Sequence, residues 1–372
     1  MSEFSEQDHR FMQRALDLAA KGVYTTSPNP SVGCVLVKEG KIVGEGFHFK
    51  AGQPHAERVA LTQAGDKAKG ATAYVTLEPC SHYGRTPPCA LGLIEAGVVK
   101  VVAAMQDPNP QVAGKGLKML AEAGIESAVN LLNDFAENLN KGFLKRMRQD
   151  VPFVQLKLAM SLDGRTAMAS GESKWITGAA SRSDVQKMRA KSSALLSTSS
   201  TVLADDPSLN VRWNDFPDDL KKDYAKETVR QPIRVILDSK HRIQPTHKLF
   251  ETNSPVWLVS SEARDLSNFP DFCEQILLPK ENLLSELMIE LGKRQINTLW
   301  VEAGANLAGS LIEQKLADEL IIYIAPKLLG DQARGLCRLP HLLQLADAPL
   351  WQLEEFQQIG DDIKLTYKPK GS

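Results

Sequence analysis

Cysteine is scarce in this sequence, and long apolar runs are missing. Only five cysteines occur among 372 residues, and they are widely scattered. An odd, dispersed set is not a disulfide framework and is typical of a reducing compartment, so we expect a cytoplasmic protein. A membrane-spanning helix needs a run of about eighteen apolar residues, and the sequence contains no such run. The N-terminal segment is polar and lacks the apolar core of a secretory signal.

An excess of charge of one sign is also missing, and aromatic residues are few. The chain has 44 Lys and Arg against 45 Asp and Glu, and its aromatic content is 6%. Proteins that bind nucleic acids usually present a basic face with interleaved aromatic side chains. The composition therefore favours a small-molecule substrate over a nucleic acid or a membrane.

The composition changes near residues 145–152, where the charged segment KRMRQD is followed by Pro152. We predict two domains, residues 1–148 and 149–372, each long enough to bury its own core. In both parts, apolar strands alternate with helical patterns, which indicates layered α/β domains. The segment 214–231 is charged and weakly periodic, and we expect it to be a surface excursion.

Several elements can be placed from their patterns. Ser5 can cap a first helix that Gly22 ends, and a turn at Glu39-Gly40 joins two strands. Further strands are predicted at ATAYVTL, VVKVVAAM, FVQLKLAM, PIRVILD, PVWLVSS, NTLWVEA and ELIIYIA, and a closing pair near the C-terminus. Helices are predicted at HAERVALTQAG, at ALGLIEAG and before Gly124.

The strongest chemical signal is His55-Ala56-Glu57 followed by Pro79-Cys80 and Cys89. One imidazole and two thiolates suit zinc, and three protein ligands leave a fourth position for water. Zinc lowers the pKa of that water, and Glu57 is placed to move protons without being a ligand. This arrangement is the zinc-deaminase signature, although eight residues separate the cysteines where two are usual. We predict a catalytic zinc site that deaminates a nitrogen heterocycle.

Two other interpretations remain open at this point. A structural zinc site needs a fourth protein ligand, such as His82 or Cys34, and has no use for Glu57. A deaminase acting on a base in nucleic acid needs the basic, aromatic surface that this composition disfavours.

The second half has no G-x-G-x-x-G motif. Its nearest equivalent is a strand that ends at Glu302-Ala303-Gly304 and leads directly into a helix. Free N–H groups at a helix N-terminus suit a pyrophosphate, and Gly309 allows the helix to pack closely. Taken alone, this pattern is a weak indication of a nucleotide site.

The wider motifs resemble the bifunctional riboflavin-biosynthesis deaminase/reductase family. The first half carries SPNPSVGCVLV, HFKAGQPHAE and PCSHYGRTPPC, and the second carries QLKLAMSLDGRTAMASGESKWITG, TVLADDPSLNVR and VEAGANLAGSLI. The resemblance covers about residues 5–370. It implies a cytidine-deaminase-like three-layer α/β domain followed by a dihydrofolate-reductase-like α/β domain, and self-association of the chain.

The resemblance also implies the chemistry. The substrate is 2,5-diamino-6-ribosylamino-4(3H)-pyrimidinone 5′-phosphate, which loses its ring 2-amino group as ammonia. NADPH then reduces the ribosyl side chain to ribityl. The implied zinc ligands are His55, Cys80 and Cys89, with Glu57 as proton shuttle. The implied pyrimidine-ribotide contacts are Asn29, His48 and Arg85, although Asn29 between two prolines is also a typical turn residue.

For the reductase, the resemblance places substrate against Ser173, Arg189, Leu209, Arg212 and Glu302. It places NADPH against Ala159, Trp175, Thr177, Thr201, Asp205, Ser239, Gly304, Ala305, Asn306, Leu307, Ala308, Gly309 and Ser310. Arginine suits a phosphomonoester because its guanidinium donates in two directions, although a solvated surface charge is the simpler interpretation of each arginine.

Opening the sugar ring requires proton transfer, for which Lys157, Asp205 and Glu302 are the ionisable candidates. We expect Asp205 or Glu302 to orient the sugar and Lys157 to support charge or proton transfer. Ser199 and Ser200 stand where many relatives have glycine, and Asn210 stands where threonine is frequent.

Overall fold

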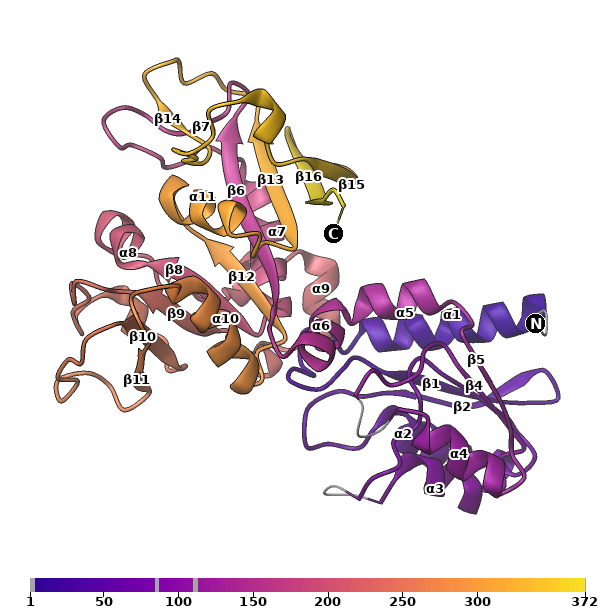
Figure 1. Ribbon diagram of the computed structural model, residues 1–372. Helices are drawn as coiled ribbons and strands as arrows, with labels where there is room; N and C mark the ends of the chain where they lie inside the picture. The colour runs from indigo at the N-terminus through magenta and orange to yellow at the C-terminus, as the bar shows by residue number, and fades with distance from the viewer. Residues whose placement is uncertain (1–3, 84–86, 110–112, 372) are drawn as a thin grey trace. The chain divides into compact units, whose positions relative to one another are not determined.

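The computed structural model describes residues 4–83, 87–109 and 113–371. The chain forms two compact units, Met1–Asp150 and Val151–Ser372, and the division lies close to the one predicted after residue 148. Each unit is built around its own sheet (Figure 1). Among the described residues, no helix has both the length and the apolar character needed to cross a bilayer.

The first unit contains a five-stranded sheet in the order β2-β1-β3-β4-β5. Its strands are β1 (Gly33–Lys38), β2 (Lys41–Phe47), β3 (Thr72–Val75), β4 (Lys100–Ala103) and β5 (Glu126–Val129). Strand β1 is antiparallel to both of its neighbours, whereas β3, β4 and β5 run parallel. The predicted β1–β2 turn is confirmed: Glu39 and Gly40 have φ of 52° and 71°, as a type I′ hairpin requires.

Helices cover both faces of this sheet (Figure 1). They are α1 (Glu6–Ala20), α2 (Ala56–Ala64), α3 (Cys89–Glu95), α4 (Lys115–Glu122), α5 (Asn133–Leu139) and α6 (Lys141–Gln149), with a 3-10 turn at Gly65–Ala68. Helix α1 begins as predicted, because the Ser5 hydroxyl accepts the Asp8 N–H while the Asp8 carboxylate accepts the Ser5 N–H. The three-layer architecture expected of a deaminase is therefore confirmed.

The second unit contains a nine-stranded sheet in the order β11-β10-β9-β8-β12-β6-β13-β16-β15. Its strands are β6 (Phe153–Ser161), β8 (Ala194–Thr198), β9 (Ile233–Leu237), β10 (Val256–Ser260), β11 (Cys273–Leu277), β12 (Thr298–Glu302), β13 (Glu319–Ala325), β15 (Trp351–Ile359) and β16 (Asp362–Pro369). From β11 at one edge to β13, each strand in this order runs parallel to the next. Strand β16 is antiparallel to β13, and β15 is antiparallel to β16. A separate ribbon pairs β7 (Arg165–Ala167) with β14 (Arg334–Gly335).

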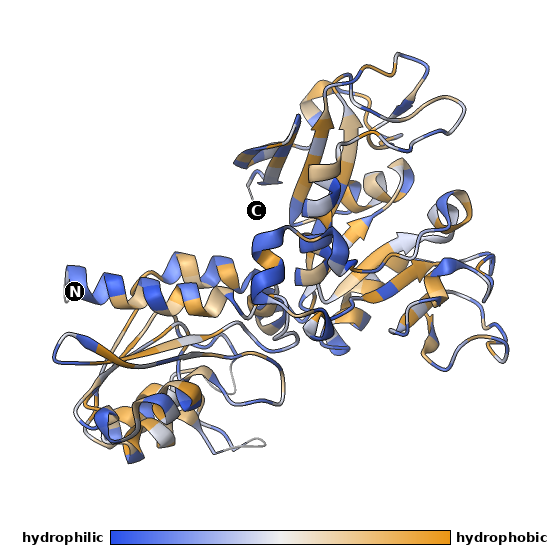
Figure 2. Ribbon diagram, turned by 180° about the vertical axis from the view of Figure 1, so that it is seen from behind, coloured by the Kyte–Doolittle hydropathy of each residue, from blue (hydrophilic) through white to orange (hydrophobic). Residues whose placement is uncertain are grey.

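Helices pack on both faces of the large sheet. They are α7 (Ala179–Lys191), α8 (Ser199–Asp205), α9 (Asp218–Asp223), α10 (Leu283–Lys293) and α11 (Ala305–Glu313). One apolar cluster includes residues of α10 and α11, and a second includes Val185 of α7 and Val202 of α8. The central strands are strongly apolar, whereas the outer pair β15–β16 is largely hydrophilic (Figure 2). A parallel sheet covered on both faces requires such continuous apolar strands.

The segment 214–231 differs in part from the expected surface excursion. It holds α9 and two short 3-10 turns, and it is anchored by Phe216 and Tyr224, which are 4% and 6% exposed. The Trp213 indole N–H donates to the Tyr224 carbonyl at 2.9 Å. The few apolar side chains in this charged segment therefore hold it against the unit.

Candidate functional site

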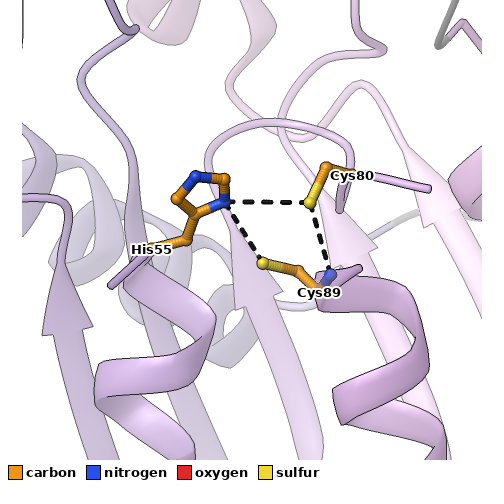
Figure 3. A group of neighbouring side chains, drawn as sticks. All are labelled: His55, Cys80 and Cys89. Atoms are coloured by element: carbon orange, nitrogen blue, oxygen red, sulfur yellow. Dashed lines mark hydrogen bonds between the residues drawn. The ribbon is translucent and has the colours of Figure 1, made fainter. Parts of the chain in front are cut away.

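Three elements of the first unit bring His55, Cys80 and Cys89 together. His55 is the N-cap of α2, Cys89 is the first residue of α3, and Cys80 follows Pro79 after strand β3. Their side chains converge at one end of these elements (Figure 3). Two of the three ligand candidates thus sit at helix N-termini, where the helix dipole favours thiolate and other negative charge.

The distances within this group suit a tetrahedral zinc ion. The Nδ1 atom of His55 lies 3.7 Å from Cys80 Sγ and 3.4 Å from Cys89 Sγ, and all three ligand atoms lie within 4.8 Å of one another. Zinc bonds of about 2.3 Å to sulfur and about 2.0–2.1 Å to nitrogen separate such atoms by about 3.6 Å at tetrahedral angles. The three side chains therefore have the donor chemistry and the spacing of a three-ligand zinc centre.

The electrostatics of the group favour the thiolate form of Cys80. The Cys89 thiol and the Cys89 N–H both donate toward Cys80 Sγ, the latter over 3.3 Å, and they lower the pKa of Cys80 to about 4. Hydrogen bonding to Cys80 also raises the pKa of His55. Thiolate character is what a zinc ligand needs.

Glu57 lies two residues after His55, in the first turn of α2, and is 3% exposed. Its Oε2 atom is buried and has no hydrogen-bond partner among the residues that the structure describes. Burial is the main cause that raises the pKa of Glu57. A buried carboxylate oxygen without a partner is costly, so its presence beside the three ligands indicates a group that completes the site when bound.

Asn29 and His48 form a second pair beside the ligands. Asn29 Nδ2 lies 3.0 Å from His48 Nε2, and His48 Nδ1 lies 3.1 Å from the Pro54 carbonyl oxygen. The carbonyl can only accept, so Nδ1 carries the proton and Nε2 accepts from the Asn29 amide. The His48 ring packs edge-on against the His55 ring at 5.2 Å, and burial lowers the pKa of His48. The predicted Arg85 lies outside the described residues.

In the second unit, the predicted cofactor residues gather at the carboxyl ends of neighbouring parallel strands. Ala159 lies in β6, Thr201 follows β8, Ser239 follows β9, and Gly304 follows β12. These four strands are adjacent in the order β9-β8-β12-β6. Open α/β sheets bind ligands outside the carboxyl ends of their strands.

Helix α11 begins at this edge without a side-chain cap. A Cβ atom on Gly304 would meet nothing within 4 Å, whereas one on Gly309 would lie 1.8 Å from the Arg338 carbonyl oxygen. Gly309 therefore serves close packing, as its position in the helix predicts. Leu307 and Ala308 are also buried, so only the first turn of α11 is open to a ligand.

Glu302 ends strand β12, and two residues donate hydrogen bonds to its carboxylate. Its carboxylate accepts from Arg189 Nε at 2.6 Å, from Arg189 Nη2 at 2.7 Å and from the Trp300 indole at 2.8 Å. Burial alone raises the pKa of Glu302, but the Arg189 guanidinium outweighs it and holds the pKa at about 2. Arg189 Nη1 donates to the Asn210 carbonyl at 2.9 Å, so this arginine is engaged within the chain.

Lys157 pairs in register with Glu302 across β6 and β12. Its Nζ lies 5.9 Å from the centre of the Tyr323 ring, and burial lowers the pKa of this lysine. A lysine with a lowered pKa releases its proton more easily than a surface lysine. Lys157 and Glu302 are thus partly buried neighbours of opposite charge on adjacent strands.

The remaining predicted reductase residues have diverse surroundings. Lys174 Nζ lies 3.3 Å from Asp205 Oδ1, which brings the segment 173–177 beside the end of α8. Trp175 in that segment is 63% exposed. Arg212 pairs with Asp215 at 2.6 Å, and Leu209 lies in the core at 3% exposure. The structure gives Arg212 and Leu209 partners of their own, so their contact with substrate stays a prediction.

Comparison with known proteins assigns each unit to a protein family. The family described as "Cytidine and deoxycytidylate deaminase zinc-binding region" matches residues 5–105, and the "RibD C-terminal domain" matches residues 152–365. The chain is 84% identical over 371 residues to the riboflavin biosynthesis protein RibD of Haemophilus influenzae, covering 100% of both chains. The chain belongs to the RibD family.

Solved RibD structures share this fold over almost the whole chain. Acinetobacter baumannii RibD superposes with a TM-score of 0.92 at 48% identity, covering 98% of this chain and 99% of that one. A Thermotoga maritima diaminohydroxyphosphoribosylaminopyrimidine deaminase/5-amino-6-(5-phosphoribosylamino)uracil reductase superposes with a TM-score of 0.86 at 34% identity, with the same coverage. The expected family and fold class are confirmed, and this member of the family is a bifunctional deaminase/reductase of riboflavin biosynthesis with a zinc-binding deaminase domain.

Glu78 is a buried residue, two positions before Cys80, that the sequence motifs did not single out. It is 3% exposed and accepts backbone N–H groups from Asp107 at 3.2 Å, Gly114 at 3.0 Å and Gly116 at 2.9 Å. It therefore holds Asp107 and the start of α4 against the segment that carries Cys80. The available signal was an acidic residue directly after the apolar strand and directly before Pro79-Cys80.

Proposed function

We propose that this chain deaminates 2,5-diamino-6-ribosylamino-4(3H)-pyrimidinone 5′-phosphate and then reduces the ribosyl side chain of the product with NADPH. The observation that carries the deaminase half is the convergence of His55, Cys80 and Cys89 at zinc-ligand spacing beside the unpartnered oxygen of Glu57. The names of the RibD relatives support the riboflavin pathway, and the name of the Thermotoga maritima relative supports the substrate class.

In this proposal, His55, Cys80 and Cys89 hold the zinc ion. Bound zinc supplies a Lewis acid that activates a water molecule near neutral pH. Glu57 passes the proton of its buried carboxyl group to the ring nitrogen, takes a proton from the water that adds to the ring carbon, and passes this second proton to the departing ammonia. The remaining proton of the water restores the carboxyl group. Its place in the first turn of α2, two residues after the His55 ligand, fixes the carboxyl group beside the reacting carbon.

Asn29, His48 and Arg85 bind the pyrimidine ribotide in this proposal. The hydrogen bond from the Asn29 amide to His48 leaves the Asn29 carbonyl oxygen as the acceptor for an N–H of the ring. Arg85 belongs to the sequence between the two cysteines and supplies a cation for the substrate phosphate.

The reductase unit holds NADPH along the carboxyl ends of β6, β12, β8 and β9. The donor chemistry fits: the uncapped first turn of α11 offers N–H groups to a pyrophosphate. Bound NADPH supplies the hydride for C1′ of the opened sugar. Trp175 and Thr177 of the segment beside Asp205 close over the cofactor, and Ser173 and Arg212 contact the substrate.

Glu302 and Lys157 take different roles in the reduction. Glu302 stays ionised because Arg189 lowers its pKa, so it orients the sugar hydroxyl groups by accepting hydrogen bonds. Lys157 is the proton donor, because Glu302 is already ionised and burial lowers the pKa of the Lys157 ammonium group below that of a surface lysine. The Arg189 guanidinium positions Glu302 and does not need to reach the phosphate.

We further propose that residues 1–148 deaminate, that residues 149–372 reduce, and that the chain self-associates in the cytoplasm. All five cysteines are free thiols, which supports a reducing compartment. Strand β15 is the edge of the large sheet, and it exposes Leu353 at 49% and Phe356 at 62%. Large apolar side chains that an edge strand exposes are usually covered in the functional state.

A paired assay tests the proposal. The zinc-replete chain receives the diamino-pyrimidinone ribotide with and without NADPH, and ammonia release and NADPH oxidation are followed separately. We expect ammonia release without NADPH, and NADPH oxidation only after deamination. Absence of ammonia release contradicts the substrate, whereas ammonia release without any later NADPH oxidation contradicts the reductase half alone.

A further inference from the structure

The side chain of Arg242, in the loop after β9, is held by two serines that directly follow β8. Its Nη2 atom donates to Ser199 Oγ at 3.0 Å and to Ser200 Oγ at 2.9 Å. Ser199 and Ser200 begin helix α8 directly after β8, and Arg242 lies in the loop that follows β9. The two strands are parallel neighbours in register, Thr198 opposite Leu237, so both loops leave the sheet at the same edge.

The charge of Arg242 has no acidic partner among the residues that the structure describes. The nearest acidic side chain in its own loop, Asp238, is paired with Arg264 at 3.1 Å and accepts the backbone N–H groups of Arg242 and Ile243. Within the described ranges, Nη1 and Nε of Arg242 have no acceptor, and the residue is exposed. The guanidinium is therefore oriented by two hydroxyl groups while most of its donors stay available.

This cation stands where the adenosine end of a bound dinucleotide would lie. Strand β8 separates β9 from β12, and the uncapped first turn of α11 follows β12. A dinucleotide whose pyrophosphate rests on α11 extends along the same sheet edge toward β8 and β9. In dinucleotide sites, an acidic residue recognises the free ribose 2′-hydroxyl of NADH, and an arginine accommodates the 2′-phosphate of NADPH. Here the acidic candidate, Asp238, is already occupied.

We propose that Arg242, positioned by Ser199 and Ser200, binds the 2′-phosphate of NADPH and is the residue that selects the phosphorylated dinucleotide over NADH. The inference rests on the proposed NADPH-dependent reduction and names a specificity residue within it. A phosphomonoester dianion matches the planar donors of a guanidinium. Each serine hydroxyl accepts from Arg242 and can donate its own O–H to a phosphate oxygen.

Binding of cofactor fragments to the full chain tests this directly. Titration calorimetry compares adenosine 2′,5′-diphosphate with adenosine 5′-monophosphate on the wild type and on Arg242→Ala. We expect the wild type to bind the 2′,5′-diphosphate at least about tenfold more tightly, as one or two charge-assisted hydrogen bonds provide. In Arg242→Ala the ratio falls to about one, while the affinity for the monophosphate stays the same.

Matched variants and a kinetic comparison sharpen the result. Arg242→Lys keeps the charge but loses the planar set of guanidinium donors, so its affinity ratio for the two fragments should lie between those of the wild type and Arg242→Ala. Combined Ser199→Ala and Ser200→Ala substitutions should weaken the binding of the 2′,5′-diphosphate only. Lys222→Ala removes an exposed cation of α9 in the same unit and should change nothing. In reduction, Arg242→Ala should raise KM for NADPH and leave NADH kinetics unchanged. Equal effects on both fragments, or none, overturn the proposal, whereas a chain that oxidises neither dinucleotide contradicts the proposed function instead.

Discussion

The carboxylate of Glu302 and the guanidinium of Arg189 form a two-pronged ion pair, with N–O distances of 2.6 Å and 2.7 Å. The side chains are 15% and 9% exposed, so water screens the pair little. Removing one partner of a buried pair leaves the other charge without compensation. The pair therefore couples the end of β12 to helix α7 and fixes the carboxylate at the proposed reductase site.

The substitution Glu302→Gln should destabilise the second unit by about 3–5 kcal/mol, because the Arg189 charge stays buried without a partner. All five tryptophans lie in Val151–Ser372, so tryptophan fluorescence during urea unfolding reports on this unit alone. Glu313→Gln, on an exposed position of α11, is the control and should leave the unfolding midpoint in place. An unchanged midpoint in Glu302→Gln would show that the pair contributes nothing to stability.

The substitution Glu57→Gln should lower the rate of ammonia release by about 10²- to 10⁴-fold, since a positioned proton donor contributes that much. Zinc content, measured by atomic absorption, should stay at the wild-type level because Glu57 is not a ligand. Glu95→Gln on the exposed side of α3 is the matched control. Full deaminase activity in Glu57→Gln would show that Glu57 is not the proton shuttle.

Alanine substitutions at Cys89 and Cys34 distinguish a zinc ligand from a cysteine outside the zinc site. Cys89→Ala should lose both zinc and ammonia release, while NADPH oxidation with the already deaminated substrate continues in the other unit. Cys34→Ala should keep its zinc, because Cys34 is not part of the group formed by His55, Cys80 and Cys89. Zinc loss in Cys34→Ala would instead identify Cys34 as a fourth ligand.

The substitution Lys157→Arg should slow NADPH oxidation by about 10²-fold or more and leave ammonia release unchanged, because a guanidinium keeps the charge but does not release its proton. The binding of NADPH should persist, which equilibrium quenching of tryptophan fluorescence can measure. Retained NADPH oxidation in Lys157→Arg would remove Lys157 as proton donor and leave it as a source of positive charge.

Acid should unfold the second unit partly through Asp184. Burial alone raises its pKa, but Lys364, at 2.7 Å, outweighs this and lowers the pKa from 3.8 to about 2. A lowered folded-state pKa stabilises the fold above pH 3.8, and this contribution is lost as the pH falls toward 2. Its size is on the order of 2 kcal/mol.

The urea midpoint, followed by tryptophan fluorescence, should therefore decrease between pH 4 and pH 2. Asp184→Asn should be less stable at pH 7 and should show a weaker pH dependence across that interval. If both proteins lose stability in parallel, Asp184 is not the group responsible.

Local patterns predicted most of the elements because their causes are local. The Ser5 cap, the Glu39-Gly40 turn and the apolar strands β6, β9, β10, β12 and β13 all depend on neighbouring residues. Strands β5, β8 and β11 were not predicted. Strand β5 is short and half exposed, and β8 consists of small and polar residues beside two leucines, so neither gives a strong strand pattern.

The side-chain partnerships were not predictable in the same way. Arg189 meets Glu302 across 113 positions of the sequence, and Asp184 meets Lys364 across 180. A single sequence carries no signal that links such positions, because only the sheet order brings them together. The motif around His55 and Cys80 was predictable because the chemistry of zinc restricts its ligands to few residue types.

Of the two cysteine ligands, Cys89 belongs to a helix and Cys80 lies in the loop that leaves strand β3. Cys80 follows β3 immediately after Pro79, and Cys89 opens α3, with its N–H donating to Cys80 Sγ at 3.3 Å. The three ligands are therefore placed by two helix starts and by the loop that leaves β3, and not by the residues that connect Cys80 to Cys89. That connection can lengthen, shorten or change its side chains during evolution while the hydrolytic chemistry stays intact. Changes of sequence between the two cysteines can therefore admit new substrates while the three ligands stay the same.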